Sequence, residues 1–138
     1  MALQQGATDA FKTGLMNGGY NFTSGSFKMA LYTGSATLGP STAVYTSTNE
    51  VVATGYTAGG IALPVSVTPT SSNNITYFSF SNVTWYGSIT ARGALIYQSG
   101  GSNPTVCVLD FGSDKTSITS LTVQFPTANS SNAIIRIT

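Results

Sequence analysis

The chain has 138 residues, of which 41% are hydrophobic and only 7% are charged, and its formal net charge is +1. Seven Phe and seven Tyr residues, with long Val, Ile and Thr runs, exclude a disordered chain. No stretch approaches the roughly 20 apolar residues of a membrane-spanning helix. The five basic residues are too dispersed for sequence-independent binding of nucleic acid. The polar surface must therefore be largely uncharged, which weakens repulsion between copies and favours a subunit of an assembly.

Residues 1–22 predict a short helical arm. Phe11 and Leu15 stand four residues apart, as on one face of a helix, and Thr8 or Asp9 can cap its start. Asn17 and the two glycines after it end any helix, so we expect about two turns.

The N-terminus lacks the basic and apolar regions of a signal peptide, which predicts synthesis in a reducing cytoplasm. The lone cysteine, Cys107, fits that compartment, because small secreted proteins more often carry paired cysteines. Cys107 stands in the apolar run 106–109, so we expect a buried small side chain rather than a reactive thiol.

From residue 26 onward the apolar pattern has a period of two. In residues 27–32, Phe27, Met29 and Leu31 share one face and the residues between them take the other, which predicts a half-buried strand. The Ser/Thr-rich stretch 42–60 predicts an ordered loop with a short strand at 51–54. Pro64 interrupts the next strand-like run, and it predicts an edge strand or a bulge there because proline cannot donate to a ladder.

The remaining strands are short and separated by turn residues. They are expected at 75–80, 83–86, 89–97, 105–111, 121–125 and 134–137. The run 105–111 is apolar on both faces, which is typical of a central strand. We therefore predict a single all-β domain over residues 1–138. It comprises a helical arm (1–22) and a sandwich or barrel of seven or eight antiparallel strands (23–138).

Titratable groups are too scarce to predict an enzyme. The chain has no histidine and only four carboxylates. Asp110 and Asp114 could form a catalytic pair or a weak calcium site, but Asp-Phe-Gly-Ser-Asp is also ordinary turn chemistry, which we favour. We expect no catalytic residue, no cofactor and no metal.

Two groups of side chains are candidates for contact with a partner. Among the clustered aromatic residues, we expect Phe78, Phe80 and Trp85 in the core, while Tyr77 and Tyr86 could be exposed.

Arg92 interrupts an apolar strand and needs a carboxylate, solvent or a partner. Glu50, Asp110 and Asp114 are its candidate mates within the chain, and an intersubunit ion pair is equally open.

Several blocks of the sequence resemble small virion proteins of tailed bacteriophages. The most specific are Asn49-Glu50 through Gly59-Gly60 and Thr90 to Tyr97, and weaker blocks extend the resemblance over nearly the whole chain. The resemblance implies a virion component and supplies no catalytic residue. The chain lacks the long repeats of a fibre shaft, which favours a capsid decoration (cement) protein.

The leading hypothesis is a decoration protein that bridges and stabilises major capsid subunits. It predicts assembly in the bacterial cytoplasm, location in the virion, a homo-oligomer, contacts with the major capsid protein or other virion proteins, and neither nucleic acid nor membrane as a partner. The alternatives are a neck, tail or fibre-tip component that binds a receptor or glycan, and a small glycan hydrolase using Asp110 and Asp114. The candidate contact residues are Phe11, Tyr32, Glu50, Tyr56, Tyr86 and Arg92.

Overall fold

The computed structural model describes residues 3–137, and its secondary structure is almost entirely β. In chain order the elements are β1 (Gly6–Ala7), α1 (Asp9–Asn17), β2 (Phe27–Tyr32), β3 (Ile61–Ala62), β4 (Val65–Ser72), β5 (Ile75–Phe80), β6 (Val83–Tyr86), β7 (Thr90–Gln98), β8 (Thr105–Thr116), β9 (Ser120–Val123) and β10 (Ile135–Ile137). The prediction of a small all-β domain with one short N-terminal helix is confirmed.

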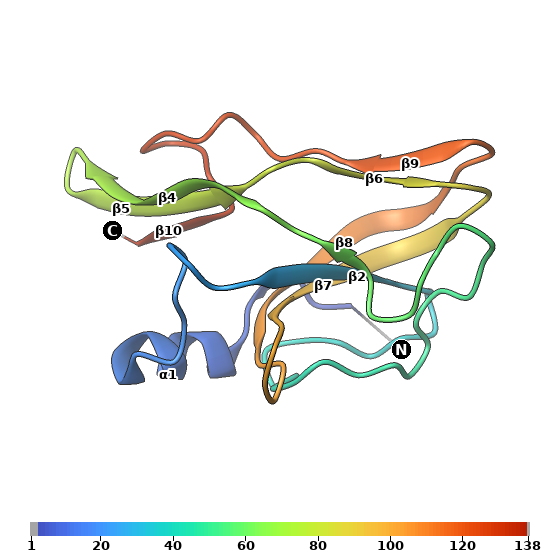
Figure 1. Ribbon diagram of the computed structural model, residues 1–138, viewed down its shortest axis with the longest axis horizontal. Coiled ribbons are helices and arrows are strands. Elements are labelled where there is room, and N and C mark those ends of the chain that lie inside the picture. The colour runs from blue at the N-terminus through green and yellow to red at the C-terminus, as the bar shows by residue number, and fades with distance from the viewer. Residues whose placement is uncertain (1–2, 138) are drawn as a thin grey trace.

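The strands form three antiparallel sheets arranged as a sandwich. One layer is a five-stranded sheet of order β1-β8-β7-β2-β3. The facing layer is built from a three-stranded sheet, β10-β5-β4, and the pair β6-β9 (Figure 1). The sheets end at separate edge strands and do not pair into a ring, so the barrel alternative is wrong.

The main core fills the space between the two layers. Its aromatic centre is Phe22, whose ring stacks on Phe78 at a centroid distance of 4.0 Å and on Phe27 at 4.8 Å. Phe80 and Trp85 are also buried in this cluster, which confirms the core assignment of Phe78, Phe80 and Trp85.

A second, smaller core lies on the outer face of the five-stranded sheet. There Ala30, Tyr32 and Tyr97 pack under Leu38 and Tyr45 of the long connection 33–60, coloured cyan to green in Figure 1. Strand β2 is therefore buried on both faces, and the expectation of a half-buried strand is wrong. The strand expected at 51–54 is absent, because the backbone pairing of this connection with β2 is limited to an isolated bridge between Tyr32 and Glu50 and does not extend into a ladder.

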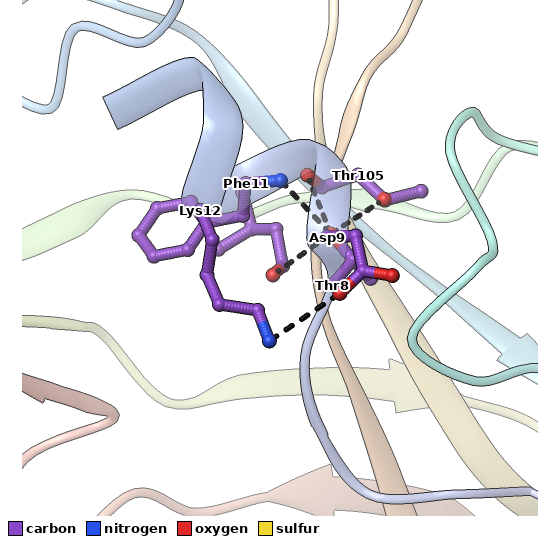
Figure 2. Close-up of polar contacts among 6 residues, drawn as sticks. Thr8, Asp9, Phe11, Lys12 and Thr105 are labelled. Carbon is purple, nitrogen blue, oxygen red and sulfur yellow. Dashed lines mark hydrogen bonds and ion pairs between the residues drawn. The ribbon is translucent and has the colours of Figure 1, made fainter. Parts of the chain in front are cut away.

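Helix α1 is attached to the sandwich at its N-terminus. The buried Thr8 hydroxyl accepts a hydrogen bond from the Phe11 amide at 3.2 Å, as an N-cap does, and the Thr105 hydroxyl donates to it at 2.9 Å (Figure 2). Phe11 then enters the main core, and Gly18 ends the helix in the left-handed conformation. The predicted cap and stop are confirmed, and the 1–22 segment shares the core of the sandwich.

The strand pairing is interrupted at two places, at Pro64 and at the stretch Asp110–Asp114. Pro64 separates β3 from β4, which are edge strands of different sheets, in agreement with its predicted effect. The stretch Asp110–Asp114 does not reverse the chain as a turn would. It lies within β8 as a bulge, because Gly93 of β7 faces Asp110 whereas Ala91 faces Lys115.

A substitution at Gly60 tests how closely the connection 33–60 approaches β2. Its φ is +86°, and a Cβ there would lie 1.9 Å from the Met29 carbonyl oxygen. We expect Gly60→Ala to lower the free energy of unfolding by about 3 kcal/mol or more in urea denaturation. Gly101→Ala is the matched control, since a Cβ there meets no atom within 4 Å. Equal stability of both variants would contradict the close approach of this loop to β2.

Candidate functional site

The most organised polar cluster surrounds the carboxylate of Glu50. Glu50 is only 7% exposed, and both of its oxygens are used. The Tyr45 hydroxyl donates to Oε1 at 2.6 Å, the Tyr56 hydroxyl donates to Oε2 at 2.5 Å, and the Gly59 amide donates to Oε2 at 2.7 Å. Buried carboxylates are stable only when their lone pairs are satisfied in this way.

Further tyrosine bonds connect this cluster to the sheet. The Tyr56 hydroxyl also accepts a hydrogen bond from the Leu31 amide at 2.9 Å, and the Tyr97 hydroxyl donates to the Gly59 carbonyl at 2.6 Å. Tyr32 donates to the Thr46 carbonyl at 2.5 Å. We call Glu50 with Tyr32, Tyr45, Tyr56 and Tyr97 the Glu50 cluster.

The tyrosines of the Glu50 cluster have pKa values above the ordinary range. Burial is the largest cause in each case, and the negative charge of Glu50 adds to it. Burial also raises the pKa of Tyr20. The hydroxyls thus remain protonated and continue to donate at alkaline pH values where an exposed tyrosine would ionise. The cluster fastens the connection 33–60 to β2 and β7.

Arg92 and Asp110 form a partly exposed ion pair at the bulge of β8. Arg92 Nε lies 3.5 Å from Asp110 Oδ1, without the alignment of a hydrogen bond, while that same oxygen accepts the Gly112 amide at 2.9 Å. Of the carboxylates considered for Arg92, the structure thus selects Asp110. Arg92 and Asp114 also line a cavity of about 330 Å³.

An apolar groove lies between α1 and β10. It measures about 670 Å³ and is lined by Ala7, Phe11, Lys12, Leu15, Met16 and residues 134–137. Met16 is 90% exposed, and Leu15 and Ile137 are exposed as well. Figure 1 shows α1 and β10 at the same end of the molecule.

Three more apolar side chains are exposed at the opposite end. They are Val52, Tyr86 and Ile118, and they come from adjacent loops, since the Gly87 amide donates to the Thr119 carbonyl and the Gly55 backbone lies against that of Tyr86. Tyr86, which is 74% exposed, also lines a cavity of about 220 Å³.

The candidate contact residues fall into two groups in the structure. Phe11, Tyr32 and Glu50 are buried within the chain, so the folded subunit does not present them to a partner, and this part of the expectation needs correction. Their burial has a physical reason in each case. Phe11 carries α1 into the main core, Tyr32 of β2 is covered by the connection 33–60, and Glu50 anchors that connection through its hydrogen bonds. Tyr56 is partly buried in the Glu50 cluster, and Arg92 and Tyr86 remain accessible.

The sequence interpretation missed the groove and the partners of Glu50. The spacing of Phe11 and Leu15 predicts a helix face, but no pattern connects Leu15 with Ile137, which lies more than a hundred residues away in the chain and lines the same groove. A signal for the Glu50 cluster did exist. Tyr45, Glu50 and Tyr56 stand close together in a stretch that is otherwise rich in Ser and Thr.

Comparisons of the chain with protein-family models, curated proteins and solved structures found no significant match. Among residues 3–137, no group of three or more acidic or cysteine side chains is placed to hold a metal ion. No helix in the described chain has the length and hydropathy needed to cross a bilayer. Cys107 is buried, as predicted, and burial raises the pKa of its thiol to about 12.

Glu50 substitutions test the role of the cluster. We expect Glu50→Ala to lower the free energy of unfolding by about 2–4 kcal/mol, because it leaves the Tyr45 hydroxyl and the Gly59 amide without acceptors. Glu50→Gln should cost less, because its amide can donate to one tyrosine hydroxyl. The control is Asp114→Asn at an exposed carboxylate, with an expected change within about 0.5 kcal/mol. Urea denaturation gives all three values, and equal values for Glu50→Ala and the control would contradict the role.

Alkaline pH should weaken the fold through the same tyrosines. A pKa raised above the unfolded value of about 10 means that the native state keeps protons that the unfolded state releases. The stabilisation is complete below about pH 10 and is lost as pH rises toward the native pKa values. Cys107 acts in the same direction from about pH 8.5.

The measurement is the urea midpoint against pH, with tyrosinate absorbance followed in parallel. We expect the midpoint to fall above about pH 10 and the absorbance of the buried tyrosines to rise only with unfolding. The variant Tyr45→Phe should show a shallower fall. A midpoint independent of pH, or full tyrosinate absorbance in the folded state, would contradict the burial of these hydroxyls.

Proposed function

We propose that the chain is a structural subunit of a tailed-phage particle, a capsid decoration protein that bridges and stabilises major capsid subunits. The observation that carries the proposal is its surface, which combines few charges with large exposed apolar side chains at both ends. Exposed apolar patches gain free energy when another chain covers them, and low charge lets neighbouring copies approach. The resemblance of blocks 49–60 and 90–97 to small virion proteins supports the same proposal.

The mechanism is adhesion between proteins. Copies at junctions between capsid subunits, arranged as a symmetric homo-oligomer, would add buried interface that internal pressure must break. Many contacts of modest strength then act together through multivalency. A rigid subunit suits this task, and the Glu50 cluster holds its longest connection in one conformation.

A second candidate is a fibre-tip or tail subunit that binds a host glycan or receptor. The exposed ring of Tyr86 beside a cavity of about 220 Å³ favours it, because aromatic rings stack on sugar faces. The copy number per particle separates the two, since a capsid decoration protein is present in far more copies than a tail component.

Particles that lack this chain provide the test. We expect them to release DNA at a lower temperature than complete particles, because the bridges between capsid subunits are missing. Adding back the purified chain should restore the temperature, and a variant with Met16→Asp and Ile118→Asp should restore it less. Release at the same temperature, or absence of the chain from the capsid, would contradict the decoration role.

A further inference from the structure

We propose that the groove between α1 and β10 is a docking site for an extended segment of another protein chain, one that carries apolar side chains and a carboxylate. The inference concerns the kind of partner and holds wherever in a particle the subunit is located. It rests on the shape of the groove, the strand edges beside it and the charges at its rim.

The groove is bordered by an edge strand of each layer. Ala7 of β1, the outermost strand of the five-stranded sheet, lines one wall, and β10, the outermost strand of the three-stranded sheet, lines another. Helix α1 contributes Phe11, Leu15 and Met16. Apolar side chains in a channel of about 670 Å³ gain free energy when a partner displaces the water over them.

The edge of β10 makes an extended partner the natural occupant. Among residues 3–137, β10 pairs with β5 alone, through Ile135, Arg136 and Ile137. An unpaired strand edge offers backbone donors and acceptors to an incoming strand, and alternate side chains of that strand then enter the neighbouring apolar groove.

The rim charges select an acidic segment. Lys12 and Arg136 line the groove, and they are two of only five basic residues in the chain. Lys12 is paired with Asp9 at 3.3 Å, whereas Arg136 donates to the Ser130 carbonyl and forms no ion pair with any described residue. A carboxylate beside Arg136 would be complementary.

The same charge disfavours a second copy of this chain as the occupant. If two β10 strands paired in the antiparallel register that uses all three residues, each Arg136 would lie opposite its counterpart. Like charges directly opposite each other destabilise a strand pair. Arg136 therefore opposes edge-to-edge association of copies while it attracts an acidic strand.

The test begins with a displayed library of random linear peptides, selected against the whole chain. We expect selected peptides to alternate apolar residues and to carry Asp or Glu. A labelled selected peptide should bind Met16→Asp and Arg136→Met at least about tenfold more weakly than the original chain. Ile118→Asp is the matched control, because that side chain is 87% exposed between β8 and β9 and does not line the groove, and it should leave binding within about twofold.

Two further measurements complete the test. The same peptide, N-methylated at alternate residues, should lose binding, because methylation removes the amide donors of a paired strand. Circular dichroism of each variant establishes that it is folded. If no peptide is selected, or if selected peptides bind the groove variants as tightly as the original chain, the docking site is wrong. Unchanged binding of the methylated peptide would overturn the pairing of the peptide with the edge of β10. If the chain alone forms a dimer that Met16→Asp dissociates, the groove is an interface between two copies of the chain and the proposal is wrong.

Discussion

One buried carboxylate holds the outer side of this sandwich together. Glu50 accepts three hydrogen bonds, from Tyr45, Tyr56 and the Gly59 amide, and so anchors both halves of the connection 33–60 to a single point. The Tyr56 hydroxyl continues this network to the backbone of β2. Because a buried charge is tolerated only with its partners in place, these bonds stabilise the conformation of the connection. That conformation covers the outer face of the sheet and creates the second core.

The second core explains why the central strands carry apolar side chains on both faces. β2 and β7 are packed from one side by the smaller sheets and from the other by the connection 33–60. The chain thereby forms three layers, which are the two layers of sheets and the connection 33–60, and it does so with few charged residues. The uncovered apolar surface remains at two ends, at the α1–β10 groove and around Tyr86 and Ile118. Both the proposed assembly role and the proposed docking site depend on this division between a covered sheet and open ends.

Burial revises the set of residues that could contact a partner. Tyr32 and Glu50 lie inside the Glu50 cluster, where they stabilise a loop, and Phe11 lies in the main core. The most exposed apolar side chains are instead Met16, Val52 and Ile118, which no sequence pattern singles out. Their exposure favours contact with another protein, because the chain has few charged residues and so repels neighbouring molecules only weakly.

Local patterns in the sequence determined the all-β class, the helix from its Thr8 cap to its Gly18 stop, the break at Pro64 and the core role of Phe78, Phe80 and Trp85. These features follow from interactions between residues that are close in the chain, or from the alternation of apolar and polar residues, and both can be read from a single sequence. Tertiary structure decided the two-sided burial of β2, the bulge at Asp110, the mate of Arg92 and the groove. Each of these depends on which distant segments lie near one another, as when Leu15 and Ile137 line the same groove, and a single sequence does not specify such pairings by its local pattern.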